Sequence, residues 1–445
     1  MKKSLPPEAG RRTVLLVEFF SRGGVMHYSL QLARALAGEA APDVSITLLT
    51  ARHAEAAAPV GVRLLPWLAT WNPHRAPRYL PRRLVRAARG LRYVWVWMQV
   101  LAAVRREQPA FILMTDLEHR CDGWFARKLR RWCRRQQPPV PLADIWHNVE
   151  AFERHQKGKL QRQLHWRIRL AQVFDTVFVH GTTLQAQFTE LTGRGACAIP
   201  HGNLAWMAEQ AGPDPGLNQR LRLAPQQPLA LLFGSLSAYK GVEVLLAAMA
   251  ALTAASRPLL LIAGMPTAVS QLQRWHDYVR QQGLEPWVRW DTRYIPLPEV
   301  AWYFRRADWV VLPYRAIAQS GVAHAALTFG RPLLVTAVGG LPELIDGNGI
   351  LVPANDPAAL AQAMERMAAA PQLREQWGRR SLELAYSRHA WGPIAHTVLA
   401  AAAPQLLPHP PTIPVETRND PAGAAVHSCA STPERVRGDA HGLYL

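Results

Sequence analysis

The sequence predicts an α/β protein made of two doubly wound domains, each with a mostly parallel sheet. Short apolar runs alternate with amphipathic stretches of helical period, which is typical of buried strands and the helices that cover them. The pattern occurs twice, on either side of a polar segment rich in proline and glycine at 211–227. The 445 residues are 49% hydrophobic and 19% charged, a globular composition with enough length for two or three domains.

The first half begins with a βαβ pattern. Residues 13–20 form an apolar run of strand length, 21–24 form a tight turn, and 25–37 carry apolar residues at helical spacing. Residues 44–49 are rich in β-branched side chains and predict the next strand. Further strands are predicted at 111–114, 142–146 and 176–179.

The second half repeats the alternation and ends in a polar tail. Strands are predicted at 229–233, 259–263, 288–290, 309–312 and 333–336, with helices at 242–254, 271–282, 297–307, 321–328, 357–369 and 371–386. We predict an N-terminal domain at 1–210, a linker at 211–227, a C-terminal domain at 228–388, a last helix at 389–403 and a disordered tail at 404–445.

The charge of the chain is unevenly placed. The formal net charge is +19 at pH 7, and residues 1–175 hold 30 Lys and Arg against 13 Asp and Glu. Residues 176–445 hold 21 against 19 and are nearly neutral. The first half therefore predicts an anionic partner, which could be nucleic acid, anionic lipid or a phosphorylated substrate.

Cysteines and apolar runs exclude some classes of protein. The four cysteines show no C-x-x-C pair and no metal-ligand spacing, so we expect free thiols in a reducing compartment. The polar N-terminus is not followed by an apolar segment of signal-peptide length. The apolar run at 93–104 is too short to span a bilayer.

A glycine loop with one lysine follows the predicted strand at 229–233. Gly234 and Ser235 open the loop, and Lys240, the only lysine in residues 160–445, precedes a predicted helix. Backbone N–H groups at a helix start and an ammonium group suit a phosphate. An ordinary turn with an exposed lysine is the alternative, and the Walker A pattern is missing.

Two more loops of this kind follow the predicted strands at 309–312 and 333–336. One places an N-capping serine before a helix, and the other enters a Gly-Gly turn followed by an acidic residue. Capping alone would explain either loop, but three such loops at strand ends of one domain indicate a binding site. The residues are Gln319, Ser320, Gly321, Gly339, Gly340 and Glu343.

Taken together, these loops resemble the nucleotide-sugar half of GT-B glycosyltransferases, especially family 4 and related bacterial polysaccharide transferases. The segments that carry the resemblance are FGSLSAYKGVEVLL, LPYRAIAQSGVAHAALTFGRP and TAVGGLPELIDGNGILVP, with VEFFSRGGVMHYSLQLARAL, DIWHNVEAFER and FVHGTTLQAQF in the first half. It spans about residues 13–402 in the same order. It implies two Rossmann-like domains facing a cleft, with the helix at 389–403 crossing back to the first.

The resemblance also implies roles for individual residues. Gly23 and Gly24 would lie against the donor phosphates or the transfer site, and Lys240 would pair with the diphosphate. Gly321, Gly339 and Gly340 would line the donor cleft. The loop with Tyr294 would hold the base, and His147 would lie near the donor sugar.

Some positions depart from the family pattern. Ser235 stands where a basic residue is usual, which leaves Lys240 with more of the phosphate charge. Ala325 replaces the second Glu of the family's E-x7-E pair, so Gln319, Ser320 and Glu343 become candidates for binding the nucleotide. The departure leaves the stereochemistry of transfer open.

The chemistry implied by the resemblance needs charge stabilisation and, if transfer inverts, a base. Helix N-termini and one cation can stabilise the leaving diphosphate, and no D-x-D motif argues for a metal, so we expect no cofactor. A base would come from the first half, with His147 and Glu150 as the chosen candidates and Asp116 and Glu118 as alternatives.

Two stretches rich in Arg and Trp carry the basic charge, at 78–106 and 124–135. A basic helical stripe beside aromatic residues is typical of a helix at an anionic membrane surface. Exposed helices without a partner are the alternative, and no nucleic-acid recognition motif is present. The residues expected at the membrane or acceptor are Arg82, Arg86, Arg89, Trp95 and Trp97.

The sequence therefore predicts a cytoplasmic, peripheral-membrane hexosyltransferase. Its partners would be a nucleotide sugar, a glycan or lipid-phosphate-linked acceptor and an anionic membrane, without nucleic acid. The alternatives are a GT-B sugar-nucleotide epimerase and a non-catalytic basic scaffold or nucleic-acid-binding protein.

Overall fold

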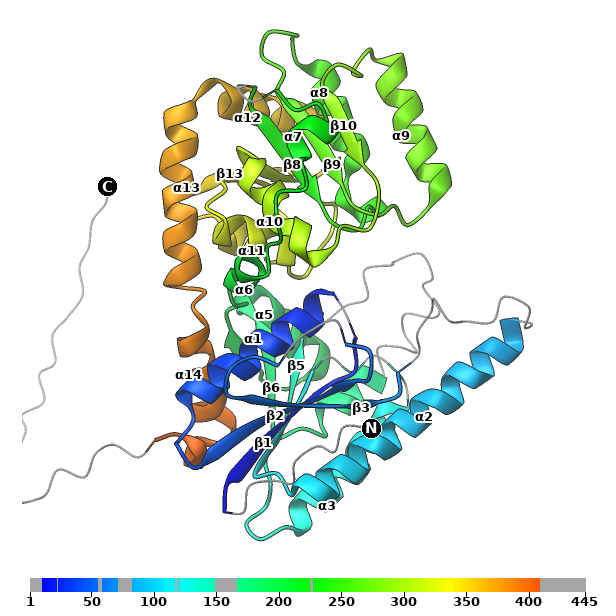
Figure 1. Ribbon diagram of the computed structural model, residues 1–445, viewed down its shortest axis with the longest axis vertical. Coiled ribbons are helices and arrows are strands. Elements are labelled where there is room, and N and C mark those ends of the chain that lie inside the picture. Colours follow the sequence, from blue (N-terminus) through cyan, green and yellow to red (C-terminus); the bar gives the residue numbers. More distant parts are fainter. Residues whose placement is uncertain are drawn as a thin grey trace, which may run out of the picture. The chain divides into compact units, whose positions relative to one another are not determined.

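The computed structural model describes residues 10–21, 23–54, 58–70, 82–115, 117, 119, 121–148, 166–224 and 227–408. These residues all belong to one compact unit that ends at Pro408 (Figure 1). Most of the predicted tail at 404–445, together with Glu150, Asp116 and Glu118, lies outside the described residues.

The N-terminal half is a parallel sheet covered by helices. Its seven described strands have the order β3-β2-β1-β4-β5-β6-β7. The strands are β1 (Arg12–Glu18), β2 (Val44–Ala51), β3 (Val62–Leu68), β4 (Phe111–Thr115), β5 (Leu142–Trp146), β6 (Thr176–His180) and β7 (Cys197–Ile199). The helices include α1 (Gly24–Glu39), α2 (Arg82–Glu107), α3 (Asp122–Arg135) and α5 (Gly181–Thr192).

The C-terminal half has the same plan. Its six described strands are parallel and have the order β10-β9-β8-β11-β12-β13. They are β8 (Leu229–Phe233), β9 (Leu259–Ala263), β10 (Val288–Asp291), β11 (Trp309–Leu312), β12 (Leu333–Thr336) and β13 (Gly349–Val352). The helices are α8 (Val242–Ala251), α9 (Val269–Gln281), α10 (Leu297–Arg306), α11 (Gly321–Thr328), α12 (Pro357–Ala369) and α13 (Pro371–Tyr386).

Each sheet is buried on both faces, which explains the nearly continuous apolar strands. In β1, Leu15 and Val17 belong to one core cluster, while Val14 and Leu16 belong to the cluster on the opposite face. Successive strand residues point to opposite faces, so a strand covered on both sides needs apolar residues throughout. The prediction of two doubly wound α/β domains is confirmed.

Two short helices lie between the halves along the chain, and a last helix returns to the N-terminal half. The segment at 211–227 contains α7 (Leu217–Arg220), and α6 (Ala205–Glu209) precedes it. Helix α14 (Trp391–Ala402) packs on the N-terminal half through Ile394 and Val398, in the same core cluster as α1. The turn η4 (Pro404–Leu406) follows, and Leu406 is fully buried.

Candidate active site

The loop between β1 and α1 has an open glycine pair. Gly23 has φ +87°, a backbone conformation that favours glycine, and a Cβ at Gly23 or Gly24 would meet no atom within 4 Å. Gly24 begins the 16-residue helix α1, so unpaired N–H groups of its first turn face this space. The geometry suits an anion, as predicted for the donor phosphates.

The loop after β8 folds over the side chain of Lys240. Lys240 is only 3% exposed, and its Nζ donates to the carbonyl oxygen of Phe233 at 2.6 Å. The ammonium also lies 5.1 Å from the ring centroid of Tyr314. A Cβ at Gly234 would come within 2.9 Å of Nζ, so glycine there lets the loop close over the lysine. Burial lowers the pKa of Lys240 to about 8. Ser235, beside it, is exposed.

The loops after β11 and β12 pack tightly on each other. The Oγ of Ser320 accepts from the backbone N–H of Ala323 at 3.3 Å and caps α11, while Gly321 has open space around it. A Cβ at Gly339 would overlap the carbonyl oxygen of Ile317, and one at Gly340 would overlap Gln319. These two glycines are thus required by the contact between the loops, and their contact with a donor stays a prediction.

Glu343 and Gln319 reach the N-terminal half. The Glu343 carboxylate accepts from the backbone N–H groups of Thr183 at 2.7 Å and Thr182 at 3.3 Å, at the first turn of α5. Gln319 Nε2 donates to the carbonyl oxygen of His180 at 2.9 Å. Burial alone would raise the pKa of Glu343, but hydrogen bonds from Thr183 and Thr182 outweigh it and lower the pKa. Glu343 therefore joins the halves in this structure, and its role in nucleotide binding stays a prediction.

Five histidines meet where the strand ends of the two halves approach each other. The Nδ1 of His147 lies 3.1 Å from the Nε2 of His180, and His201 stacks on His324 with ring centroids 4.3 Å apart. The rings of His324 and His389 are 4.8 Å apart. Sequence analysis did not anticipate the cluster because its members come from five separate segments.

Burial keeps the histidine cluster neutral. Burial first, and His201 second, lower the pKa of His147 to about 3. Burial also lowers the pKa of His201 to about 4, and those of His180 and His324 fall well below the usual value. A histidine with so low a pKa is a weak general base at neutral pH. In this structure His147 is a buried, neutral side chain packed against His180, and a catalytic role for it stays a prediction.

The residues predicted at a membrane surface lie on helix α2, which exposes some of them and buries one. Trp95 is 58% exposed, and Arg86 and Arg89 are exposed too. Arg82 is the first residue of the helix. Trp97 is completely buried, and its Nε1 donates to Asp122 Oδ1 at 2.9 Å. The prediction that Trp97 faces a membrane or acceptor is therefore wrong, because this side chain belongs to the core between α2 and α3.

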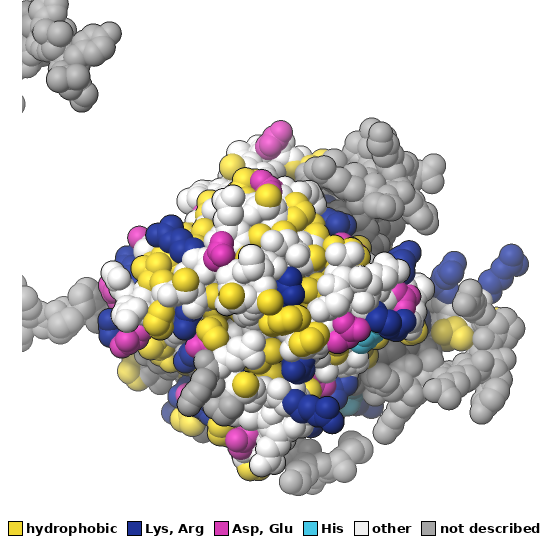
Figure 2. All heavy atoms as spheres, turned by 90° about the horizontal axis from the view of Figure 1, so that it is seen from above, with side chains coloured by type: hydrophobic (Ala, Val, Ile, Leu, Met, Phe, Trp, Pro, Cys, Tyr) yellow, Lys and Arg dark blue, Asp and Glu magenta, His cyan; other side chains and the backbone are white. Residues whose placement is uncertain are grey.

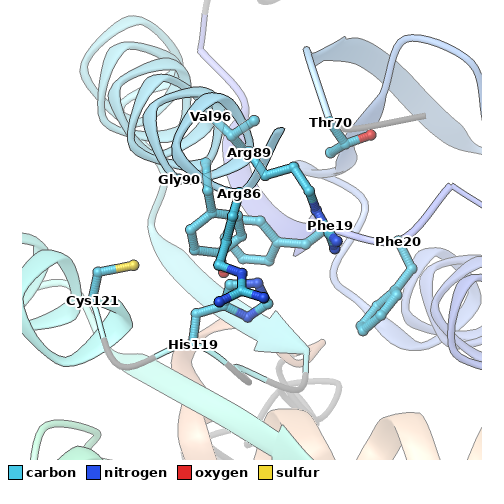
Figure 3. A pocket seen from close by; sticks show the side chains of 10 residues that line it. Phe19, Phe20, Thr70, Arg86, Arg89, Gly90, Val96, His119 and Cys121 are labelled. Atoms are coloured by element: carbon cyan, nitrogen blue, oxygen red, sulfur yellow. The ribbon is translucent and has the colours of Figure 1, made fainter. Parts of the chain in front are cut away.

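A pocket of about 400 Å³ lies beside α2, at the carboxyl ends of β1 and β4 (Figure 3). Arg86 and Arg89 line it together with residues that sequence analysis missed. Two of the missed residues, Phe19 and Phe20, could have been predicted because they directly follow β1, and ligands bind at the carboxyl ends of parallel strands. The missed residues are Phe19, Phe20, Thr70, Gly90, Tyr93, Val96, His119 and Cys121.

Tyr294, the residue predicted beside the nucleotide base, is 51% exposed in the loop after β10. The end of the molecule seen from above in Figure 2 mixes acidic and basic side chains. This agrees with the near-neutral charge of residues 176–445. Among the described residues, no group of three or more His, Cys, Asp or Glu side chains is arranged to hold a metal.

Two parallel-sheet domains with loops at the carboxyl ends of their strands define a GT-B fold, and comparison with solved structures agrees. Sucrose-phosphate synthase of Thermosynechococcus elongatus superposes with a TM-score of 0.66 at 22% identity, covering 87% of this chain and 97% of that one. Anabaena Alr3699/HepE in complex with UDP-glucose gives 0.62 at 17% identity, covering 87% and 98%. These identities establish the fold alone.

Residues 227–370 match the family described as "Glycosyl transferases group 1". The chain is 29% identical over 192 residues to D-inositol 3-phosphate glycosyltransferase of Thermobifida fusca, covering 41% of this chain and 44% of the relative. The enzyme of that name from Xylanimonas cellulosilytica is 33% identical over 152 residues, covering 33% and 36%. The chain thus spans less than half of these curated relatives. The resemblance to GT-B glycosyltransferases is confirmed.

Proposed function

We propose that the protein is a glycosyltransferase that moves a hexosyl group from a nucleotide-diphosphate sugar to a glycan or lipid-linked acceptor, as in polysaccharide biosynthesis. The observation that carries the proposal is the family match at 227–370, because it includes the loops with Lys240, Ser320 and Gly339. The complex of Anabaena Alr3699/HepE with UDP-glucose supports the choice of donor class.

The arrangement suits the departure of a nucleoside diphosphate. Negative charge grows on the leaving phosphate during transfer, and preorganised donors stabilise it most effectively in a site with little water. The open N-terminus of α1 at Gly24 and the buried ammonium of Lys240 are the two groups we assign to this charge. A metal is not needed in this scheme, and activity that persists in EDTA would support that part.

A thermal-shift screen against nucleotide sugars tests the proposal. A ligand that binds only the folded protein raises its melting temperature. We expect at least one nucleotide-diphosphate sugar to raise Tm, and its nucleotide to be released only when an acceptor is present. Release without an acceptor would favour the epimerase, and no shift with any nucleotide sugar would favour a scaffold.

We also propose that α2 docks on the cytoplasmic face of an anionic membrane. Its exposed apolar side chains at helical spacing are flanked by arginines, which suits lipid tails and headgroups respectively. These exposed residues are Leu84, Leu91, Val94, Trp95 and Met98. No helix among the described residues combines the length and apolarity needed to span a bilayer.

Sedimentation with liposomes tests this docking. We expect binding to anionic vesicles and not to neutral ones, and we expect Trp95→Ser to weaken it severalfold. Leu382→Ser is the matched control, because Leu382 is an exposed apolar residue on α13, away from α2. Equal binding to both kinds of vesicle, or equal loss in the two variants, would contradict the docking.

A further inference from the structure

A network of charged side chains holds the loop that follows β10. The loop starts after Asp291, the last residue of this edge strand, and runs through Tyr294 to the start of α10 at Leu297. The carboxylate of Asp291 is buried, and its Oδ1 accepts from Arg293 Nε at 2.9 Å. A buried carboxylate needs hydrogen bonds on both oxygens, and the partners of the second oxygen come from other elements.

The second oxygen of Asp291 binds the segment that connects the two halves. Arg220, at the end of α7, donates from Nη1 to Asp291 Oδ2 at 2.8 Å and from Nη2 to the hydroxyl of Tyr303 at 2.9 Å. Tyr303 lies on α10, is fully buried, and donates its own proton to the same Oδ2. Arg220 therefore ties the connecting segment to the loop after β10.

Arg293 completes the network from within the loop. Its guanidinium pairs with Glu299 on α10 and donates to the hydroxyl of Tyr303 at 3.2 Å. Two guanidinium groups, two carboxylates and one hydroxyl thus compensate one another. Burial alone would raise the pKa of Asp291, but hydrogen bonds from Tyr303 and Arg220 outweigh it and lower the pKa. The network is satisfied before a ligand binds, and removal of one member leaves the others short of a partner.

The network fixes the shape of a loop that exposes an aromatic ring. Tyr294 is half exposed, whereas the next residue, Ile295, is buried in the same core cluster as Leu217 of α7. Both neighbours of Tyr294 are therefore anchored, Arg293 by the network and Ile295 by the core. A fixed backbone presents the ring of Tyr294 at the carboxyl end of the sheet.

Tyr294 lies within reach of the phosphate site that we assign to Lys240. The order β10-β9-β8 puts the loop after β10 two strands away from the loop after β8. Neighbouring strands are about 4.8 Å apart, so the two loops start about 10 Å apart, a span that a ribose bridges between a diphosphate and a base. The loop after β9 lies between them and exposes Met265, whose carbonyl oxygen accepts from the N–H of Leu236 at 2.9 Å. A nucleoside there would meet apolar and aromatic surface.

We propose that Arg220 is a positioning residue for the nucleoside of the donor. It holds Asp291 and Tyr303, these set the backbone of the loop, and the ring of Tyr294 stacks on the base. The segment that connects the halves is thus part of the donor site. The inference rests on the proposed transferase function. It adds that the loop binds the base by shape and stacking, because its charged groups, Asp291 and Arg293, are already paired with each other.

Titration calorimetry on the full chain tests the proposal with ligands that differ only in the nucleoside. The probes are inorganic pyrophosphate and the nucleoside diphosphates UDP, dTDP, GDP, CDP and ADP. In the wild type we expect at least one nucleoside diphosphate to bind more tightly than pyrophosphate, and the ratio of the two Kd values measures the contribution of the nucleoside. We expect Arg220→Ala to reduce this ratio about tenfold, the size of one lost base-stacking contact, and to leave the Kd of pyrophosphate unchanged.

Arg306→Ala is the matched control, because Arg306 fastens the same connecting segment to α10 without a hydrogen bond to the loop among the described residues. It donates to Asn218 Oδ1 at 2.9 Å and to the carbonyl oxygen of Ala224 at 2.8 Å. The control should lower Tm and leave the ratio unchanged. Tyr303→Phe removes only the shared hydroxyl and should lower the ratio, so the test does not depend on how well Arg220→Ala folds. An unchanged ratio in both network variants, or an equal loss in Arg306→Ala, would overturn the proposal.

The same titrations separate this inference from the proposed function. If a nucleoside diphosphate keeps its full advantage over pyrophosphate in Arg220→Ala and in Tyr303→Phe, the positioning role fails and the transferase proposal stands. A wild type that binds pyrophosphate as tightly as every nucleoside diphosphate would also overturn the inference. If neither nucleoside diphosphates nor nucleotide sugars bind the wild type, the proposed function itself fails.

Discussion

The two cationic regions of the molecule differ in how far their charges are already satisfied. Lys240 is buried, donates to a backbone carbonyl and faces the ring of Tyr314. Arg86 and Arg89 are exposed and lack such partners in the described structure. One region is assembled before any ligand arrives, whereas the guanidinium groups of the other have no partner among the described residues.

The difference follows from the backbone that carries each region. Lys240 lies among glycine loops whose close contacts fix its position, so a ligand there meets a charge that need not reorganise. Arg86 and Arg89 extend from a helix surface and can adapt to the ligand. A preorganised cation suits a leaving diphosphate that is common to many donors, and adaptable arginines suit the mobile headgroups of an anionic membrane.

The largest expected effect comes from the backbone of the donor loop. Gly241 has φ +67°, and a Cβ there would overlap the carbonyl oxygen of Pro313. We expect Gly241→Ala to lower the free energy of unfolding by about 4 kcal/mol through strain and overlap. Gly90→Ala is the opposite case and should raise it by about 1 kcal/mol. Calorimetric melting checks both, and equal effects would contradict the contrast between a packed loop and an open pocket.

The contact between the two halves, where the histidine cluster lies, should weaken in acid. The folded pKa of His147, about 3, and that of His201, about 4, lie below the value of about 6.5 in an unfolded chain. The unfolded chain therefore binds more protons, so this stability is complete above pH 6.5 and is lost as pH falls toward the folded pKa values. Each such histidine contributes about 1.4 kcal/mol per pH unit in that window.

Urea unfolding at pH 7 and pH 5 measures this loss. We expect His201→Gln to reduce the difference in unfolding free energy between the two pH values. His396→Gln is the control, because His396 is exposed on α14. A wild type that is equally stable at both pH values would show that protonation of these histidines does not weaken the contact between the halves.

A smaller effect is expected from Glu343, which connects the C-terminal half to α5. Glu343→Ala removes the acceptor for two backbone N–H groups, and we expect a loss of about 2 kcal/mol in unfolding free energy. Glu375→Ala removes an exposed ion pair with Arg379 and should cost well under about 1 kcal/mol. Denaturant titration that finds equal losses would argue against a joining role for Glu343.

The smallest expected effect is a gain. Ser235 is exposed beside the buried Lys240, where the related family carries a basic residue. We expect Ser235→Arg to strengthen nucleotide-sugar binding by about 1 kcal/mol, because it adds a second cation to the phosphate site. Ser235→Gln controls for side-chain size and should not strengthen binding. A calorimetric Kd that is unchanged in Ser235→Arg would place the phosphate elsewhere.

The fold was predictable because strands covered on both faces leave a strong apolar signal. The three strands that sequence analysis missed, β3, β7 and β13, are edge strands. β3 contains Pro66 and buries only Val62, Leu65 and Leu68, β7 is three residues long, and β13 is four residues long. Proline is tolerated at an edge because the strand is paired on one side only. Such strands lack the continuous apolar pattern that predicted the others.

The candidate site was predictable only in part. Trp95 and Trp97 are about 200° apart around α2, so both could not face one surface, and only tertiary packing decides which is buried. Phe19 and Phe20 continue the apolar run of β1, although the strand ends at Glu18. Only the structure shows that they turn toward the arginines of α2 and form a pocket.

The most direct test compares the two regions in the same two variants, by calorimetric titration of a nucleotide sugar and by sedimentation with anionic liposomes. Lys240→Met keeps most of the side-chain volume without the ammonium, and Arg86→Ala with Arg89→Ala removes the charge of the pocket. We expect Lys240→Met to lose the nucleotide sugar and keep its binding to anionic liposomes, and the double arginine variant to bind these liposomes more weakly and keep the nucleotide sugar. Loss of both kinds of binding in either variant, or of neither, would contradict two separate cationic sites.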